Sequence, residues 1–434
     1  MRVFLQALGC RLNEAELESW SRDCRERGFT LAASAEQADL VVINTCAVTG
    51  ESARKSRQLI RRAQRSNPQA KLVVSGCLAS LEPRQTAAGL GIDLVVQNPD
   101  KDRLIGIAAE QLDLPVMPEV ATEPGENALL ARGRHRAFIK VQDGCRYRCA
   151  FCIVTSARGE ERSRPVTEVV DEVRRLHAEG VQEVVLAGVH LGGYGSDIGS
   201  DIGSDLARLV RAVLAGTSIP RVRLGSLEPW ELPEGFWELF DDARLMPHLH
   251  LPIQSGADTV LRRMSRRCRS TEFRELVAAA RAHVPGFNVT TDIIVGFPGE
   301  TDAEWGQTIA LAEETQFGHI HIFAYSPRTG TKAAAMPGQV SRDIKRERSK
   351  QLHTISQAGR QRVLEQAIGR HYDVLFEQCR GESPDGRPTC VGYTPNYLRV
   401  ALDPRGCPDL QNKIARVRAV RVSDDASCLI AELL

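Results

Sequence analysis

Short apolar runs alternate with amphipathic stretches in the first quarter of the chain. Runs of three to six apolar residues favour strands, whereas apolar positions that recur every three or four residues favour helices. The amphipathic stretches cover 13–27 and 50–65, and the apolar runs are Val3–Leu8, Leu40–Ile43, Leu72–Val74 and Asp93–Val96. This β-α-β alternation predicts an open sheet of parallel strands with helices on its faces.

A cysteine follows each of the first three runs. Cys10 comes after the first, Cys46 after the second and Cys77 after the third. Because parallel sheets form their binding crevice along the edge where the strands end, we expect these three thiols to converge. A single such cysteine is usually just a small buried apolar side chain, but three at equivalent positions favour a shared metal site. Cys24, inside the first predicted helix, is expected to be ordinary packing.

Six further apolar runs, separated by helical patterns, fill the middle of the chain. They are Ala137–Val141, Glu183–Ala187, Val222–Leu227, His248–Gln254, Val289–Val295 and His319–Tyr325. Six βα units predict a parallel sheet curved into a partial (β/α)6 barrel, with its site at the carboxyl ends of the strands. Polar and apolar residues alternate in the later runs, and this period of two directs one set toward the lumen. The polar set expected there is His248, His250, Gln254, Asp292, His319, His321 and Tyr325.

The pattern changes again near residue 366, to short β-rich runs with turn signals and no helical period. These runs predict a small antiparallel barrel of the oligonucleotide-binding kind; examples are Tyr372–Phe376, Tyr397–Ala401, Ile414–Val422 and Cys428–Leu433. In this barrel Tyr393 and Tyr397 either stack on bases or belong to the core.

These patterns divide the chain into four stretches. A segment with three prolines and no clear period predicts an extended linker before the partial barrel. The expected organisation is an N-terminal α/β domain over 1–112, the linker over 113–134, the partial barrel over 135–365 and the terminal barrel over 366–434.

The tightest signal in the chain is a C-x3-C-x2-C pattern just after the run that ends at Val141. Its cysteines are Cys145, Cys149 and Cys152. This spacing is too tight for three separate structural roles and suits three thiolates around one iron–sulfur cluster. It departs from the two C-x2-C pairs of a closed zinc site. Three protein ligands would leave one iron open to a substrate or cofactor.

Composition and charge narrow the class of protein. The 434 residues are 42% hydrophobic and carry a net charge of +1, so ordinary cores are expected and no overall basic field indicates nucleic acid. No apolar run is long enough to span a membrane, and the first residues lack the layout of a secretory signal. Twelve cysteines without an export signal favour metal binding over disulfides, in the cytoplasm. Basic stretches at 54–65, 262–269 and 342–362 are solvated faces or polyanion contacts, the last being the best candidate.

Taken together, these motifs resemble a known family. The C-x3-C-x2-C loop with Phe151 before its last cysteine resembles the radical S-adenosylmethionine superfamily. Leu8-Gly-Cys-Arg-Leu-Asn-Glu, Ile43-Asn-Thr-Cys and Ser75-Gly-Cys are similar to motifs of its methylthiotransferase branch. The likeness extends over nearly the whole chain through His250-Leu-Pro-Ile-Gln-Ser-Gly, Asp292-Ile-Ile-Val-Gly-Phe-Pro-Gly-Glu-Thr and a terminal barrel that resembles a TRAM domain.

The resemblance implies two 4Fe–4S clusters and S-adenosylmethionine as cofactors. The cluster on Cys145, Cys149 and Cys152 would bind S-adenosylmethionine and release a 5′-deoxyadenosyl radical on reduction. The second cluster, on the three N-terminal cysteines, would hold the sulfur atom that is transferred. The resemblance also implies a flavodoxin-like or ferredoxin-like low-potential electron donor and a sulfur source. The cofactor-binding residues that we expect are Tyr147, Phe151, Gly188, Gln254, Asp292 and Gly296.

Three motifs point to a subgroup of this branch. Leu8-Gly-Cys-Arg-Leu-Asn, Ala187-Gly-Val-His-Leu-Gly and Tyr325-Ser-Pro-Arg-Thr-Gly-Thr are most similar to the MtaB-type enzymes. These methylthiolate N6-threonylcarbamoyladenosine beside the tRNA anticodon, whereas sister groups act on isopentenyladenosine in tRNA or on an aspartate of a ribosomal protein. The residues by themselves leave two other classes open. One is a two-cluster electron-transfer protein, which needs no polar lumen, and the other is a zinc-bearing RNA-binding module.

Overall fold

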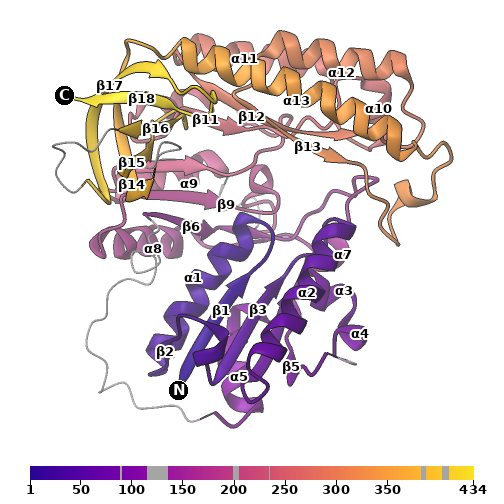
Figure 1. Ribbon diagram of the computed structural model, residues 1–434, viewed down its shortest axis with the longest axis vertical. Coiled ribbons are helices and arrows are strands. Elements are labelled where there is room, and N and C mark those ends of the chain that lie inside the picture. Colours follow the sequence, from indigo (N-terminus) through magenta and orange to yellow (C-terminus); the bar gives the residue numbers. More distant parts are fainter. Residues whose placement is uncertain (88–89, 115–134, 199–204, 234, 383–387, 403–409) are drawn as a thin grey trace.

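The protein has three parts that pack on one another (Figure 1). The computed structural model describes residues 1–87, 90–114, 135–198, 205–233, 235–382, 388–402 and 410–434. The expected linker at 113–134 therefore lies almost entirely outside the described residues. None of the helices described is both long and apolar enough to cross a membrane.

The N-terminal part is a parallel sheet in the order β2-β1-β3-β4-β5, which contains the four predicted strands and one short edge strand, β2, that was not predicted. β3 lies at the centre of the sheet and is buried along its whole length, which explains its unbroken apolar run. The three longer strands each end just before one of the three cysteines. The strands are β1 (Arg2–Ala7), β2 (Thr30–Leu31), β3 (Leu40–Thr45), β4 (Lys71–Gly76) and β5 (Leu94–Val95).

Helices cover both faces of this sheet because its strands are apolar on both sides. α1 (Arg11–Glu26) and α5 (Leu104–Gln111) pack on one face, where Trp20 and Cys24 are buried. α2 (Gly50–Ser66) packs on the other through Ile60. A capping box between Thr49 and Ser52 begins α2, because each side chain accepts the other's backbone N–H. Two short helices, α3 (Cys77–Leu81) and α4 (Pro83–Ala87), follow β4.

The central part is the predicted partial barrel of six parallel strands. It consists of two three-stranded sheets, β10-β9-β6 and β11-β12-β13, which isolated bridges such as Ser226–His250 join. Residues of the outward face, among them Ala137, Val184, Leu249 and Val289, form one apolar core with the surrounding helices. The strands are β6 (Arg136–Lys140), β9 (Glu183–Ala187), β10 (Arg221–Leu224), β11 (His248–His250), β12 (Asn288–Val295) and β13 (His319–Ala324).

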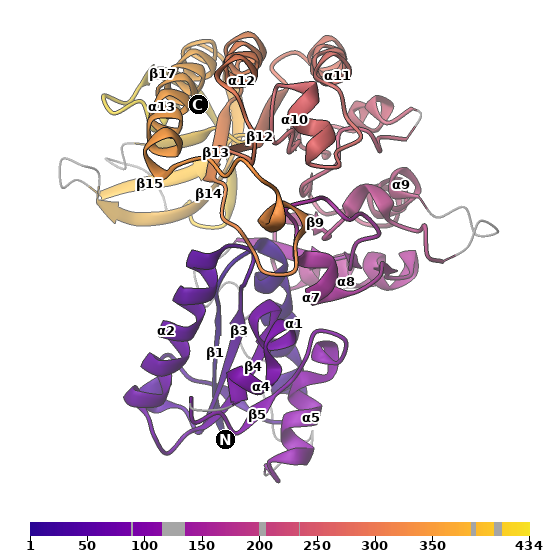
Figure 2. The same ribbon diagram turned by 90° about the vertical axis from the view of Figure 1, so that its right-hand side faces the viewer.

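The helices of the central part lie outside the curved sheet (Figures 1 and 2). They are α7 (Val154–Arg158), α8 (Val166–Ala178), α9 (Leu206–Gly216), α10 (Asp258–Arg263), α11 (Ser270–His283), α12 (Asp302–Thr315) and α13 (Arg342–Glu365). A short antiparallel pair, β7 (Gln142–Asp143) and β8 (Arg162–Ser163), brackets the C-x3-C-x2-C loop.

The C-terminal part is a closed barrel in the order β14-β15-β16-β18-β17. All its pairs are antiparallel except β16–β18, which is parallel, so the expected purely antiparallel barrel is wrong at that pair. Its strands are β14 (His371–Glu382), β15 (Pro388–Tyr393), β16 (Arg399–Leu402), β17 (Lys413–Val422) and β18 (Leu429–Leu433). The barrel closes the end of the central sheet where the strands begin. There Arg223 donates to the carbonyl of Pro395, and Asn288 donates to that of Asn396.

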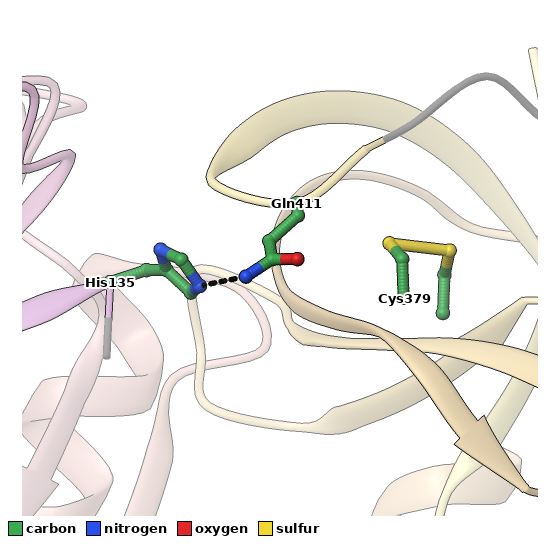
Figure 3. The surroundings of a disulfide bond; sticks show 4 residues. His135, Cys379 and Gln411 are labelled. Carbon is green, nitrogen blue, oxygen red and sulfur yellow. Dashed lines mark hydrogen bonds between the residues drawn. A yellow bond between two sulfur atoms is a disulfide. The ribbon is translucent and has the colours of Figure 1, made fainter. Parts of the chain in front are cut away.

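A disulfide joins neighbouring strands of the terminal barrel, between Cys379 on β14 and Cys390 on β15 (Figure 3). The sequence favoured metal binding over disulfides, and this pair is an exception that the spacing did not indicate. Beside it, Gln411 of the barrel lies 3.4 Å from Nε2 of His135, just ahead of β6. Cys428 is buried, and Cys407 lies outside the described residues.

Candidate active site at two cysteine loops

The C-x3-C-x2-C loop lies at the carboxyl end of β6, as expected for a site in a parallel barrel. Gly144 begins the loop at φ +74°, where a Cβ would lie 1.8 Å from the carbonyl oxygen of Glu160, so the turn requires glycine. Burial raises the pKa of Cys145 to about 12 and that of Cys152 to about 11, and Cys149 adds to both. Three thiolates here therefore need a compensating cation, which a metal centre supplies.

A buried arginine lies beside this loop, just after Met264, whose carbonyl accepts the backbone N–H of Ala150. A terminal nitrogen of Arg266 is 3.9 Å from Sγ of Cys149, and the other is 2.6 Å from a carboxylate oxygen of Glu228. Its guanidinium carbon lies 4.4 Å from the ring centroid of Trp230. Arg266 belongs to the basic stretch at 262–269, so the expectation that this whole stretch is a solvated face or a polyanion contact is wrong at this position.

A cluster of polar side chains lies beside the cysteine loop, and its histidine follows the carboxyl end of β9. The ring of His190 is hydrogen-bonded to Glu161 and forms an ion-pair contact with Glu231, and Tyr147 donates its hydroxyl to Glu231. Burial lowers the pKa of His190, but the two carboxylates outweigh that effect and raise it. Ligand atoms of Cys145, Glu161 and His190 all lie within 4.8 Å of one another. The two carboxylates therefore favour the protonated form of this imidazole, next to the first cysteine of the loop.

The structure brings the three N-terminal cysteines together at the edge of their sheet. Gly9, at φ +115°, leaves room for Cys46, whose Sγ would be 2.8 Å from a Cβ at that position. Gly76, at φ +95°, turns the chain so that α3 begins at Cys77, and a Cβ there would lie 2.3 Å from a backbone oxygen. Burial raises the pKa of Cys77, and the charges of Cys10 and Cys46 add to the rise. Cys77 is thus within electrostatic reach of both other thiols, and two of the three are buried, which suits a metal centre with three protein ligands.

A buried network of ionic hydrogen bonds connects the two loops. Arg158, at the end of α7, lies 3.0 Å from Glu16 of α1 and 2.9 Å from Asp143, which immediately precedes the first loop. Its other terminal nitrogen donates to Asn13, whose Oδ1 is 3.7 Å from Sγ of Cys10. Lys101 pairs with Glu16 on the other side. The two cysteine loops are thus fixed relative to each other by side chains from both parts of the protein.

Apolar contacts join the same two loops. Cys77 and Leu78 at the start of α3 pack with Ala47, which follows Cys46, and with Ala157 of α7 in one buried cluster. The side chain of Asn98 also donates to the carbonyl of Ala157 at 2.6 Å. None of these contacts, nor the network around Arg158, was found from the sequence, because a single charged residue or alanine carries no signal of its partner in a distant segment.

The polar face predicted for the later strands lines the lumen. His250 on β11 is hydrogen-bonded to the hydroxyl of Thr290 at 2.9 Å, and its other ring nitrogen lies 3.1 Å from the carboxylate of Asp292 on β12. Its ring centroid is 5.3 Å from that of His321 on β13. Because both ring nitrogens of His250 are engaged within the protein, this group is a hydrogen-bonded polar wall. Tyr325 does not join it, since its ring is buried against Phe297.

The expected cofactor residues differ in their surroundings. Gly188 follows β9, where a Cβ would meet Gln142 at 2.9 Å, and Phe151 packs on an apolar cluster beside the loop. Gln254, at φ +74°, shares backbone hydrogen bonds with β12. Gly296 donates its N–H to Glu300 at 2.9 Å and makes a turn. Their roles toward a cofactor remain predictions.

Tyr397 of the terminal barrel closes the base of the lumen. Its ring stacks on His248 and on Tyr393, with centroid distances of 4.9 Å in both cases, and the guanidinium of Arg223 lies 4.6 Å from its centroid. The expectation that Tyr397 offers a free face to a nucleic-acid base is therefore wrong. The alternative, that it belongs to the packed interior, is correct.

A groove of about 1050 Å³ opens beside the N-terminal cysteines. Leu8 and Gly9 line one side, and Ile322 and Phe323 of β13 line the other. Its basic residues are Lys55 of α2 and Arg342, Lys345 and Arg346 of α13.

Not every basic residue of α13 faces this groove. Arg348 is buried against Glu300 at 2.6 Å, so only part of the basic stretch at 342–362 is free to contact a polyanion. The groove therefore combines a partly positive rim with direct access to the loop of Cys10.

Comparison with known proteins identifies the family to which this chain belongs. Residues 139–312 match the model of the radical SAM superfamily, and residues 2–97 match that of the uncharacterized protein family UPF0004. The threonylcarbamoyladenosine tRNA methylthiotransferase MtaB of Bacillus subtilis (strain 168) is 34% identical over 96% of this chain and 94% of its own. The chain belongs to the radical S-adenosylmethionine methylthiotransferase family.

Other members of this methylthiotransferase family are nearly as similar. The tRNA-2-methylthio-N(6)-dimethylallyladenosine synthase of Methylacidiphilum infernorum is 33% identical over 90% of this chain and 87% of its own. Among solved structures, the radical S-adenosylmethionine methyltransferase TsrM of Kitasatospora setae, with cobalamin and a [4Fe-4S] cluster bound, matches 77% of both chains with a TM-score of 0.58. At 16% identity this likeness concerns the fold alone. Membership of the superfamily implies a 4Fe–4S cluster and S-adenosylmethionine.

Proposed function

We propose that this protein converts N6-threonylcarbamoyladenosine next to the tRNA anticodon into its 2-methylthio derivative, with consumption of two molecules of S-adenosylmethionine. The observation that carries the proposal is the presence of two separate cysteine triplets in one chain, held together by the buried network around Arg158. A reaction that activates a C–H bond and then inserts sulfur needs two such centres side by side. The substrate is proposed from the Bacillus subtilis relative.

Each triplet fits a cluster with three protein ligands. Cys145, Cys149 and Cys152 would hold the first cluster, and Cys10, Cys46 and Cys77 the second. The first, with S-adenosylmethionine bound, supplies the radical chemistry that removes hydrogen from the base, and the second supplies the sulfur.

The chain's own side chains position and shield these centres. Arg266 places a fixed positive charge beside Cys149, and Tyr147 with Glu231 forms a polar wall next to the loop. The terminal barrel closes the lumen from below through Tyr397, which excludes water from the reacting base. We assign Tyr147, Phe151, Gly188, Gln254, Asp292 and Gly296 to the binding of S-adenosylmethionine.

The tRNA would enter through the groove between α2, β13 and α13. Its basic residues suit the phosphate backbone, so binding is expected to weaken as salt rises. We propose that the terminal barrel acts as a TRAM-type RNA-binding domain over 366–434, after domains over 1–112 and 135–365. The reaction also requires a low-potential electron donor and a sulfur source, and we expect it to take place in the cytoplasm.

Mass spectrometry of tRNA nucleosides tests the substrate directly. In cells that lack this protein, 2-methylthio-N6-threonylcarbamoyladenosine is expected to disappear and its precursor to accumulate. Supplying the chain in trans restores the modified nucleoside, whereas the Cys149→Ala variant does not. If instead only the 2-methylthio derivative of dimethylallyladenosine disappears, the substrate is that of the Methylacidiphilum infernorum relative, and the proposal is wrong in its substrate.

A further inference from the structure

Arg11, the first residue of α1, follows Cys10 directly and lies against aromatic rings. Its guanidinium carbon is 5.9 Å from the ring centroid of Phe138 and 6.0 Å from that of Tyr397. No carboxylate among the described residues forms an ion pair with it. A half-buried cation with aromatic neighbours and no counter-ion is available to an anionic ligand.

Neighbouring arginines at the base of the lumen do have counter-ions. Arg223 lies 2.9 Å from the buried carboxylate of Glu183, and Arg136 is paired with both Glu183 and Glu377. These two arginines therefore form structural ion pairs. Of the arginines near Tyr397, Arg11 is the one with no carboxylate partner in the described part of the chain.

Histidines extend the wall from Tyr397 toward the groove. His248 and His250 share the hydroxyl of Thr290, at 3.1 and 2.9 Å, and the more exposed His321 makes no hydrogen bond with its ring among the described residues. Burial lowers the pKa of His321, and the charge of Arg11 adds to this effect despite the opposing Asp292. His321 is therefore neutral at pH 7 and offers one donor and one acceptor nitrogen.

The carboxylate of this wall, Asp292, lies 3.1 Å from Nε2 of His250 and forms no ion pair with Arg11 in the described part of the chain. Gly9 lines the groove two residues before Arg11, and Phe323 lines it two residues after His321, on the same face of β13. A nucleoside that approaches Cys10 from the groove would therefore meet Arg11 and His321.

The two candidate nucleosides differ in what they offer such a wall. A threonylcarbamoyl group carries a carboxylate, a hydroxyl and a urea on the adenine N6, whereas a dimethylallyl group is a hydrocarbon. An unpaired guanidinium gains a charge-assisted hydrogen bond from the first and is only desolvated by the second.

We propose that Arg11 binds the carboxylate of the threonylcarbamoyl substituent, with His321 hydrogen-bonded to the same substituent, and so selects this nucleoside over one with an apolar N6 group. This inference rests on the proposed function and adds the residues that choose the substrate. Arg11 lies next to a cysteine of the second triplet, so its contact also orients the base toward the sulfur-bearing centre.

Binding of three anticodon stem-loop RNAs to the anaerobically reconstituted full-length protein tests this assignment. The RNAs differ only at the modified adenosine, which is unmodified, dimethylallylated or threonylcarbamoylated, and affinity is measured by fluorescence anisotropy. Arg11→Gln is expected to weaken binding of the threonylcarbamoylated RNA about 10- to 100-fold and to leave the other two unchanged. Arg11→Lys, which keeps the charge, should recover part of the loss.

A matched variant in the groove separates this effect from general RNA binding. Arg342→Gln removes an exposed cation that lines the groove, and we expect it to weaken all three RNAs by the same factor. Iron content of the Arg11→Gln protein, measured in parallel, should equal that of the wild type.

The outcomes separate two kinds of failure. If the wild type does not prefer the threonylcarbamoylated RNA, the proposed substrate itself is wrong. If the wild type prefers it and Arg11→Gln retains that preference, or weakens all three RNAs equally, the assignment to Arg11 is overturned and the proposed function stands.

Discussion

Gly9 is the residue on which the geometry of the N-terminal cysteines depends most directly. It adopts φ +115°, and a Cβ there would lie 2.7 Å from Cβ and 2.8 Å from Sγ of Cys46. A side chain would therefore strain the backbone and displace a thiol at once, at a cost of about 1–3 kcal/mol for the strain alone.

Gly9→Ala is expected to remove the second cluster and spare the first. Iron per reconstituted chain should fall from about eight to about four, as two clusters of four irons become one. Gly306→Ala is the control, because Gly306 lies within α12 and a methyl group at that position would point into open space. Alanine there is neutral or slightly stabilising. Equal iron content in the Gly9→Ala and wild-type proteins would contradict this role.

The buried charge of Arg158 stabilises two buried carboxylates at once. Its side chain is 2% exposed and contacts both Glu16 and Asp143. Burial alone raises the pKa of Glu16, but Arg158 and Lys101 outweigh it and hold that pKa well below its usual range. The two carboxylates are thus kept ionised by cations that the fold places beside them.

Arg158→Met is predicted to lower the free energy of unfolding by about 3–5 kcal/mol, because it leaves Glu16 and Asp143 buried with too few cations. Arg162→Met is a matched control, since Arg162 lies 3.7 Å from the same Asp143 but is half exposed, and its loss should cost less than about 1 kcal/mol. Urea titrations of the two variants measure the difference. Similar midpoints for both would show that the network contributes little.

At the scale of elements, Glu183 at the start of β9 joins the central sheet to the terminal barrel. Arg221 and Arg223 of β10 bind its carboxylate and also donate to backbone carbonyls of the terminal barrel. Burial raises the pKa of Glu183, but Arg223, Arg136 and Arg221 outweigh it and lower the pKa from 4.5 to about 2. A lowered folded-state pKa contributes stability above pH 4.5 that is lost as the pH falls toward 2.

The stability that depends on this carboxylate is about 3 kcal/mol at neutral pH. Glu183→Gln should lose at least this amount at pH 7, and the difference from the wild type should shrink as the pH falls from 4.5 to 2. Asp373→Asn is the control, because Asp373 forms a half-exposed pair with Arg416 at 3.4 Å. Unfolding followed by circular dichroism across this pH range checks both, and a difference independent of pH would contradict the account.

The elements themselves were largely predictable from the sequence. The apolar runs before Cys10, Cys46 and Cys77 are strands of one parallel sheet. Cysteines that follow such strands in the sequence therefore lie at the same edge of the sheet. The alternation of polar and apolar residues correctly predicted that His250 and Asp292 face the lumen, because side chains along a strand alternate between its two faces. It failed at Tyr325, which follows β13 and no longer obeys that period.

Contacts between distant segments were not predictable. Arg158 and Glu16 are 142 residues apart, and nothing in the sequence around either residue indicates the other as its partner. Arg266 belonged to a run that looks like a solvated face, yet it is buried beside Cys149. The packing of Tyr397 against His248 depends on how the terminal barrel docks, which no local pattern encodes.

At the scale of the whole molecule, the three parts meet around the two cysteine loops and the lumen of the central barrel. The N-terminal sheet presents its cysteine edge to the open side of the central barrel (Figure 2), and the terminal barrel closes the base through Tyr397. The network around Arg158 and the α3–α7 contact keep the two loops adjacent. We propose different tasks for these two similar triplets, cofactor cleavage for the one at Cys145 and sulfur supply for the one at Cys10.

Parallel assays of two cysteine variants test this claim most directly. Anaerobically reconstituted Cys10→Ala and Cys149→Ala proteins are incubated with dithionite, S-adenosylmethionine and the threonylcarbamoylated RNA, and both cofactor cleavage and methylthiolation are measured. Cys10→Ala is predicted to retain cleavage and to form no methylthio product, whereas Cys149→Ala should lose both. Equal loss of cleavage in the two variants would contradict a separate role for each triplet.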